Sequence, residues 1–287
     1  MNRIGLIGIG TMGLPMAMNM ARAGLELMVY NRTSNKAGPA LEAGALEADS
    51  PKALFRWADT VIMMLSGPSA IDEVLGPVLH NQAKELKGKC VVNMGTNPPD
   101  FSRKIATYLD KAGVLFVDAP VSGTKVQAEE GSLLIMASGP DRALDQLESI
   151  FEAVGNKVVR CGAVPNACLM KLAVNIVLCA SIAGLVEGAH FAEKSGLNAE
   201  TFFQLILGGP LRNDMFAIKA QKIMEQDFSP QASIGTVREL LKHITDAAYQ
   251  MNAFIPTTLS NVNLIASAVD QGLSDEDACA IIKIFGS

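Results

Sequence analysis

The sequence has few aromatic and few charged residues for its length of 287. Aromatic residues make up 5%, with a single tryptophan, and charged residues make up 18%, against about a quarter in typical soluble domains. Hydrophobic residues make up 49%. Disordered chains need low hydrophobicity and high net charge, so this composition excludes disorder. It leaves open how so apolar a chain covers its surface.

An excess of positive charge is also missing. The chain carries 24 Lys and Arg against 29 Asp and Glu, a net charge of −5, and no basic block occurs. A nucleic-acid partner therefore has no electrostatic support. A Lys- and Arg-rich helix that could lie on a membrane surface is absent as well.

No segment is typical of a secretion signal or a membrane span. Glycines interrupt the apolar run that begins at Ile4, so it lacks the unbroken apolar region of a signal peptide. The most apolar stretch, Leu172–Val186, contains Asn175 and is too short to cross a bilayer. We expect a cytoplasmic protein with no membrane partner.

The cysteines do not form a recognisable metal or disulfide pattern. They are odd in number, no CxxC occurs, and the three histidines have no ligand-like spacing with them. Free cysteine is among the most buried residue types, so core packing and no metal site are expected. The five cysteines are Cys90, Cys161, Cys168, Cys179 and Cys279.

Apolar β-rich runs alternate with helical patterns in the first half of the chain. Such alternation predicts βαβ units and a largely parallel sheet. A helix over Thr11–Ala23 is expected after the first strand. The expected strands are Ile4–Ile9, Leu27–Tyr30, Thr60–Leu65, Cys90–Asn93, Val114–Val117 and Ser132–Ala137.

The pattern changes near Val158–Gly162, and from Pro165 onward the sequence predicts only helices. Glycines such as Gly196 and Gly272 stand where helices are expected to end. We therefore predict an α/β domain with a doubly wound sheet over residues 1–163 and an all-α domain over residues 164–287. The expected helices are Asn166–Ser195, Asn198–Leu207, Asp214–Gln226, Ile234–Asn252, Thr257–Gln271 and Asp275–Phe285.

A glycine-rich motif follows the first expected strand and opens the first helix. Its glycines are Gly8, Gly10 and Gly13, with Thr11 and Met12 between them. They allow a tight turn, close approach of the backbone to a pyrophosphate, and close helix–strand packing. The helix N-terminus then offers free N–H groups to phosphates. In this context the motif predicts a dinucleotide site.

The second expected strand ends without the acidic residue that usually holds the ribose hydroxyls of NAD. Asn31, Arg32 and Thr33 stand there instead. A guanidinium can pair with a 2′-phosphate, and the two neighbours can add neutral donors. The sequence therefore favours NADP(H) over NAD(H), although Arg32 could also be an ordinary loop cation.

Two further strand ends point to the same site. Leu65 and Thr96 stand in the turns that follow the expected strands over residues 60–65 and 90–93. Ligands of open α/β sheets bind outside the carboxyl ends of the strands. We expect both residues to line the remainder of the nicotinamide site.

These segments together resemble the β-hydroxyacid dehydrogenase family, which includes 3-hydroxyisobutyrate dehydrogenase, tartronate semialdehyde reductase and the glyoxylate/succinic semialdehyde reductases. The resemblance extends over essentially the whole chain. It implies a Rossmann-type domain, a long helix that connects it to a helical domain, and an active site in the cleft. The matching segments are GIGTMGLPMA, VYNRT, DAPVSG at Asp118–Gly123, a Lys with an Asn four residues later, Asp227–Pro230, and Ile255-Pro256.

The resemblance also implies residue roles. Ser122 and Gly123 lie in the substrate loop of the family, and Thr124 follows them. Lys171 is implied as the catalytic lysine, which gives a proton to the carbonyl oxygen in reduction and accepts one from the hydroxyl in oxidation. Asn175, on the same helix face, positions the substrate and Lys171. From the residues alone, Lys171 could instead extend its amine to the surface.

Three positions depart from the family pattern. Pro165-Asn166-Ala167 replaces glycines before the catalytic helix, and Thr124-Lys125 adds bulk and charge after Gly123. Glu239 stands where the family usually has a second lysine near nicotinamide and substrate, which reverses the local field.

Two interpretations of Glu239 stay open. Arg238 takes over the cationic role, or the substrate is a neutral or cationic carbonyl or imine compound rather than the usual small carboxylate. We slightly favour a non-standard aldehyde, ketone or imine. Arg212 is another candidate anion contact, although a loop cation near a helix start is the simpler interpretation.

The leading functional prediction is an NADP-dependent oxidoreductase acting on CH–OH groups of a small aldehyde or 3-hydroxy acid, with Lys171 as general acid/base. The alternatives are an imine reductase of similar fold and a non-catalytic cofactor-binding protein. The helices of the second half are apolar nearly all round, which predicts a homodimer or homotetramer formed through the helical domain.

Overall fold

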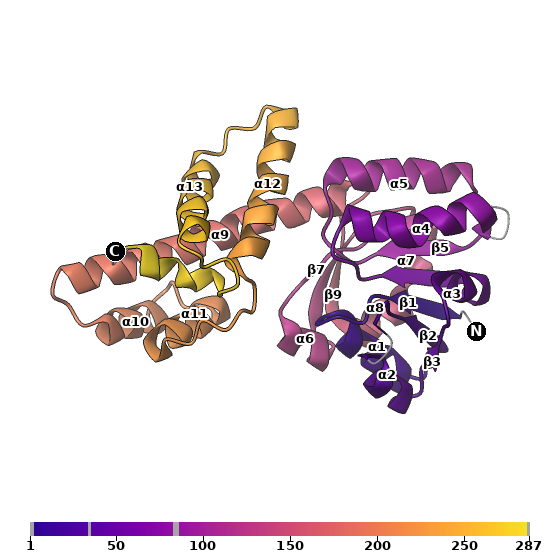
Figure 1. The fold of residues 1–287 in the computed structure, drawn as a ribbon, viewed down its shortest axis with the longest axis horizontal. Coiled ribbons are helices and arrows are strands. Elements are labelled where there is room, and N and C mark those ends of the chain that lie inside the picture. The colour runs from indigo at the N-terminus through magenta and orange to yellow at the C-terminus, as the bar shows by residue number, and fades with distance from the viewer. Residues whose placement is uncertain (1–2, 34–35, 83–85, 286–287) are drawn as a thin grey trace. The chain divides into compact units, whose positions relative to one another are not determined.

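The computed structural model describes residues 3–33, 36–82 and 86–285. The chain divides into two compact units, Met1–Lys171 and Leu172–Ser287. We call them the first and second unit and describe each by itself (Figure 1).

The first unit is built on a six-stranded parallel sheet with the order β3-β2-β1-β4-β5-β6. The order reverses beside β1, which makes the doubly wound arrangement predicted from the sequence. Every residue of β1, β4 and β5 is buried, as a sheet covered on both faces requires. The strands are β1 (Ile4–Ile7), β2 (Leu27–Tyr30), β3 (Leu46–Glu47), β4 (Thr60–Met63), β5 (Cys90–Asn93) and β6 (Leu115–Asp118).

Helices cover both faces of this sheet (Figure 1). On one face Leu6 and Ile62 pack with α1 and α8, and on the other Ile7 and Met63 pack with α3, α4 and α5. Successive residues of each strand serve the two faces in turn because strand side chains alternate. The helices are α1 (Gly13–Arg22), α2 (Gly38–Glu42), α3 (Pro51–Trp57), α4 (Pro68–Gln82), α5 (Pro99–Lys111), α6 (Lys125–Glu130), α7 (Asp141–Gln146) and α8 (Glu148–Val154).

A second, three-stranded sheet has the order β7-β8-β9 and was not expected. The apolar run Ser132–Ala137 forms β8 (Leu133–Ala137), but it pairs with β7 (Val121–Ser122) and β9 (Gly155–Arg160) rather than with the main sheet. The side chains of β9 are mostly exposed, so no apolar run in the sequence indicates this strand. Without β9, the apolar run of β8 is indistinguishable in sequence from a strand of the main sheet.

The first strand is shorter than expected. It ends at Ile7 rather than Ile9, because Gly8 has φ = 104° and turns the chain out of the sheet. The helix that follows begins at Gly13, two residues after the expected start.

The second unit is helical, as predicted. The long helix α9 (Asn166–Lys194) begins in the first unit and continues into the second. The last segment, expected as an α-helix over Asp275–Phe285, is instead the 3₁₀ helix η3 (Ala278–Phe285). The other helices are α10 (Ala199–Gly208), α11 (Asp214–Glu225), α12 (Ile234–Met251) and α13 (Pro256–Asp270).

Helix α9 is long and apolar enough to cross a membrane by length and composition, so the expectation that its apolar stretch is too short was wrong. The stretch is part of a 29-residue helix. Leu172, Ile182 and Val186 of this helix belong to the main hydrophobic core of the second unit. Of the most apolar 18-residue window of this helix, 39% is buried.

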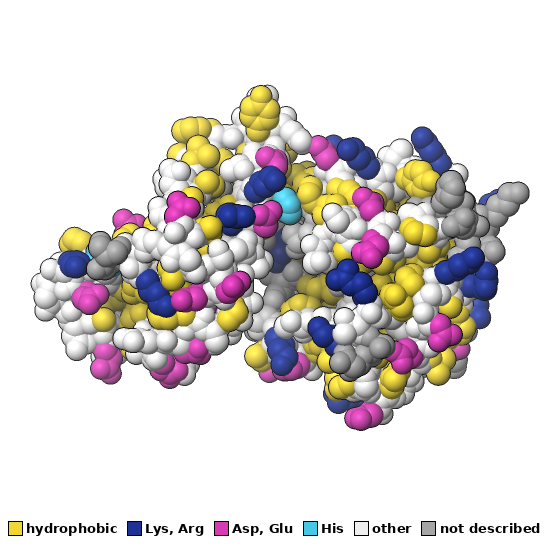
Figure 2. Space-filling model, in the orientation of Figure 1, with side chains coloured by type: hydrophobic (Ala, Val, Ile, Leu, Met, Phe, Trp, Pro, Cys, Tyr) yellow, Lys and Arg dark blue, Asp and Glu magenta, His cyan; other side chains and the backbone are white. Residues whose placement is uncertain are grey.

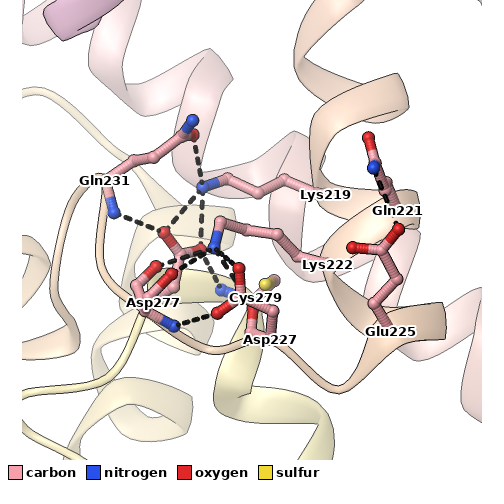
Figure 3. Close-up of polar contacts among 9 residues, drawn as sticks. Lys219, Gln221, Lys222, Glu225, Asp227, Gln231, Asp277 and Cys279 are labelled. Atoms are coloured by element: carbon pink, nitrogen blue, oxygen red, sulfur yellow. Dashed lines mark hydrogen bonds and ion pairs between the residues drawn. The ribbon is translucent and has the colours of Figure 1, made fainter.

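A polar cluster ties α11 to the C-terminal segment of the second unit (Figure 3). Lys219 donates to both carboxylate oxygens of Asp277 at 2.7 and 2.9 Å, and both side chains are buried. Burial alone raises the pKa of Asp277, but the hydrogen bonds from Lys219, Gln231 and Cys279 outweigh it and lower that pKa. One turn further, Lys222 donates to Asp227 and to Ser229. These contacts fix the chain immediately before α12.

Candidate active site

The glycine-rich motif forms a tight loop between β1 and α1. A Cβ on Gly8 would lie 2.3 Å from the Met64 carbonyl oxygen, and one on Gly13 would lie 1.9 Å from the Gly8 carbonyl oxygen. Gly10 has no atom within 4 Å of the same position and is exposed. Two glycines therefore serve close packing, whereas Gly10 leaves the backbone open to a ligand.

The N-terminus of α1 has no side-chain cap. Met12 at the N-cap position makes no side-chain hydrogen bond, and Thr11 before it is exposed. The free N–H groups of such a helix end bind phosphate, so loop and helix together fit the pyrophosphate of a dinucleotide.

Asn31 holds the loop in place. Its Oδ1 accepts from the Ile9 N–H at 3.0 Å, and its Nδ2 donates to the Thr33 carbonyl at 2.9 Å. The side chain that we expected to contact the cofactor thus already links the turn after β2 to the glycine-rich loop.

Arg32 extends from that turn into solvent. Its side chain is 84% exposed, and Nη1 lies 3.6 Å from Oε2 of Glu73 on α4. Thr33 beside it is exposed as well. No acidic residue stands at the end of β2. The ion pair with Glu73 is exposed, so Arg32 could exchange it for an anionic group on the adenosine ribose of a dinucleotide.

The ends of β4 and β5 lie against each other at the same edge of the sheet. A Cβ on Gly95 would meet the Leu65 carbonyl oxygen at 2.5 Å, which shows how closely the two turns approach. Leu65 and Thr96 are both half-buried. The structure therefore brings together the two turns that the sequence placed beside the nicotinamide.

The predicted substrate loop follows β6. Gly123 has φ = 148°, and a Cβ there would lie 2.7 Å from Leu133, so only glycine fits. Thr124 is the N-cap of α6, its hydroxyl accepts from Val126 N–H, and Gln127 completes a capping box. Ser122 is half-buried and, among the described residues, its hydroxyl makes no hydrogen bond. Ser122 is therefore free to meet a ligand, whereas Thr124 is occupied by the helix end.

Lys171 lies in the second turn of α9 and is half-buried. Burial lowers the pKa of its amine from 10.5 to about 8. An amine with this pKa exchanges protons near neutral pH, as a general acid or base must. Asn175, one turn later on the same face, is buried.

A buried polar cluster that the sequence did not predict joins this helix to the sheet. Cys168 Sγ donates to Asp118 Oδ2 at 2.7 Å, and Asn93 Nδ2 donates to Asp118 Oδ1 at 2.9 Å. Ser102 Oγ lies 3.3 Å from the sulfur. We expected Cys168 only to fill the core, because partners so distant along the chain leave no local signal.

The same cluster contains buried polar atoms without a partner. Within the described part of the chain, both amide atoms of Asn97 and Oδ1 of Asn93 make no hydrogen bond. Each such atom costs about 1–3 kcal/mol, so the region is not optimised for stability alone.

Glu239 lies on α12 in the second unit and is exposed. It forms an ion pair with its neighbour Arg238 at 3.6 Å. Glu239 also raises the pKa of His243 one turn later, although burial outweighs it and lowers that pKa overall. Arg212 is exposed in the turn between α10 and α11. The negative charge of Glu239, which stands where the family usually has a lysine, is thus partly offset by the guanidinium of Arg238.

Among the described residues, no group of three or more His, Cys, Asp or Glu is placed to hold a metal ion. All five cysteines are free. Four of them are buried and Cys161 is partly exposed.

Family comparisons cover nearly the whole chain. Residues 3–162 match the NAD-binding domain of 6-phosphogluconate dehydrogenase. Residues 166–285 match the NAD-binding domain of NADP-dependent 3-hydroxyisobutyrate dehydrogenase. The first match includes the glycine-rich loop and the uncapped helix described above.

Individual relatives agree with these matches. Glyoxylate/succinic semialdehyde reductase 1 of Arabidopsis thaliana is 29% identical over 283 residues, which are 98% of this chain and 97% of the relative. The structure of 3-hydroxyisobutyrate dehydrogenase from Salmonella typhimurium covers 99% of this chain and all of its own, with a TM-score of 0.89 and 25% identity.

An imine reductase from a Pseudomonas species is a more distant structural neighbour, with a TM-score of 0.65, 24% identity and 99% of each chain covered. This likeness shows a shared fold only. The sequence resemblance to the semialdehyde reductases is thus confirmed, and the chain belongs to the β-hydroxyacid dehydrogenase family of nicotinamide-dependent oxidoreductases.

Proposed function

We propose that the protein is an NADPH-dependent reductase of a small aldehyde, with Lys171 as the general acid/base. The observation that carries this proposal is the amine of Lys171, which is half-buried on α9 and has a pKa near 8. An unperturbed lysine would hold its proton too tightly to act as a base near neutral pH.

Preference for the phosphorylated cofactor rests on Arg32. Its guanidinium is exposed at the end of β2, where an acidic residue would repel a 2′-phosphate and select NADH. A guanidinium and a phosphate form strong charge-assisted hydrogen bonds. Arg32 and the glycine-rich loop would therefore hold the 2′-phosphate and the pyrophosphate of the cofactor.

The remaining residues orient the substrate and move one proton. NADPH, when bound, supplies the hydride. The free hydroxyl of Ser122 and the backbone around Gly123 are suited to hold the substrate's polar groups. In reduction the Lys171 ammonium gives its proton to the carbonyl oxygen, and in oxidation the neutral amine takes the proton of the hydroxyl.

The substrate class follows from the relatives and from Glu239. A named relative reduces glyoxylate and succinic semialdehyde, which makes a small semialdehyde the first candidate here. Glu239 stands at the position where the family pattern usually has a lysine, and this exchange of charge supports a second candidate, a neutral or cationic carbonyl or imine.

One experiment tests these assignments together. Loss of NADPH absorbance is followed with glyoxylate, succinic semialdehyde and a cyclic imine, for the wild type and for Lys171→Ala. We expect turnover of at least one aldehyde and a loss of about 100-fold or more in kcat for the variant, with unchanged NADPH affinity. Near-full turnover by the variant would refute the role of Lys171. Cofactor binding without turnover of any compound would favour a non-catalytic protein.

We also propose that the second unit associates with a second copy of itself. Several of its large apolar side chains are open to solvent, including Phe254 at 87% exposure. Figure 2 shows hydrophobic side chains at the surface over the turn between α12 and α13. The exposed set includes Val177, Phe191, Leu205, Tyr249, Met251, Phe254 and Leu259. Light scattering should give at least twice 30.4 kDa at micromolar concentration, and a monomer would refute this proposal.

A further inference from the structure

The buried carboxylate of Asp118 lies where β6 ends and meets the first turn of α9. We propose that Asp118 and Cys168 are positioning residues, whose hydrogen bond fixes that turn and thereby places the Lys171 amine beside the substrate loop. This inference rests on the proposed function, because it assumes that Lys171 is the acid/base.

The hydrogen bonds around the carboxylate have a consistent direction. Cys168 Sγ–H donates to Asp118 Oδ2, and Ser102 Oγ–H then donates to the sulfur. Asn93 Nδ2 donates to Asp118 Oδ1 and to the Gly95 carbonyl at 3.1 Å. All four of these side chains are buried, so water does not compete for these bonds.

Asp118 is itself held rigidly by its backbone. Its N–H donates to the Ser138 carbonyl at 2.9 Å, and Ser138 N–H donates back to the Asp118 carbonyl at 2.8 Å. The next residue, Ala119, donates to the Asn93 carbonyl at 2.7 Å. The carboxylate is therefore a fixed point shared by the ends of β5, β6 and β8, and the substrate loop starts directly after it.

The thiol transmits this fixed position to Lys171. Cys168 and Lys171 are three residues apart on one helix, about 4.5 Å along its axis. Because a helix turn is stiff, moving the Cys168 end moves the amine with it. A displacement of about 1 Å at a reacting group can cost about 100-fold in rate.

A purely structural explanation does not account for the choice of side chains. Burial raises the pKa of Asp118, which means that its charged form is costly there. Apolar side chains of similar volume commonly replace buried polar groups without loss of stability. Unlike two apolar side chains, Asp118 and Cys168 form a directional hydrogen bond that fixes the position of the helix turn.

The experiment compares Cys168→Ala, which removes the donor, with Cys168→Ser, which keeps one. Asp118→Asn preserves the shape but leaves one accepting oxygen where the carboxylate has two, so the bonds from Asn93 and Cys168 cannot both be kept as they are. Cys90→Ala is the matched control, because it removes the same sulfur from a buried site in the hydrophobic core of the first unit. Thermal melting, NADPH affinity, KM and kcat are measured for each.

We expect Cys168→Ala and Asp118→Asn to lose about 10- to 100-fold in kcat with NADPH affinity unchanged, and Cys168→Ser to stay within about threefold of the wild type. In a Lys171→Ala background, Cys168→Ala should cause no further loss, because both changes act through one amine. The inference is overturned if the kcat of Cys168→Ala matches that of Cys90→Ala, or if Cys168→Ser loses as much kcat as Cys168→Ala. It is also overturned if the double variant of Lys171→Ala and Cys168→Ala loses the product of the two single losses in kcat. A wild-type level of turnover in Lys171→Ala alone would instead refute the proposed function.

Discussion

Lys171 should make the protein less stable near neutral pH than an apolar side chain in its place. Burial holds the pKa of its amine near 8 instead of 10.5, and one pKa unit corresponds to about 1.4 kcal/mol. The charged amine therefore costs the folded state up to about 3 kcal/mol. Lys171→Met should remove this cost while it abolishes turnover.

The pH dependence gives this prediction its sign. Below about pH 8 the amine is charged in both the folded and unfolded chain, and the full cost applies. Between about 8 and 10.5 the unfolded chain binds more protons, so the stability of the wild type rises with pH. Above 10.5 both forms are neutral, and the electrostatic advantage of Lys171→Met should have disappeared.

Denaturant unfolding of both proteins at several pH values measures this difference without any substrate. Lys194→Met, an exposed lysine at the end of the same helix, is the control and should show no such trend. A difference between wild type and Lys171→Met that stays constant from neutral pH to pH 10.5 would refute the claim of a desolvated amine. Lys171 would then hold its proton too tightly to act as a base near neutral pH.

Three other predictions follow from contacts in the two units. Gly13→Ala should lower the melting temperature, because its Cβ would lie 1.9 Å from the Gly8 carbonyl oxygen. Gly10→Ala should melt like the wild type but bind NADPH weakly in a fluorescence titration, because its Cβ would lie where the pyrophosphate approaches the backbone. Lys219→Met should cost about 3–5 kcal/mol in denaturant unfolding, because it leaves the buried Asp277 carboxylate without its cationic partner. Arg32→Ala should weaken NADPH binding by about 10- to 100-fold and leave NADH binding unchanged, and equal effects on both would contradict selection of the 2′-phosphate.

The glycine-rich loop could be predicted because its chemistry is local. Gly8 needs a positive φ and Gly13 has no room for a side chain, and both requirements leave a glycine in the sequence. The main strands were predictable for a similar reason, since burial on both faces demands continuous apolar runs. By contrast, the exposed side chains of β9 carry no such run.

The polar contacts of the site were harder to predict because they join distant segments. Asn31 bonds to Ile9 and Cys168 to Asp118, pairs that are 22 and 50 residues apart. Neither bond can be inferred without the fold. The role of Thr124 could have been found, because Thr124 and Gln127 form a capping-box pattern that is visible in the sequence.

The continuity of α9 has a consequence for how this protein can diversify. Lys171 is the last residue of the first unit, and Asn175 lies one turn later in the second. A recombination event at the unit boundary would therefore split the proposed Lys–Asn pair between two parents. Exchange of helical domains between relatives keeps the pair intact only if the crossover precedes Lys171 or falls beyond Asn175, so the second turn of this helix would have to be inherited as one piece.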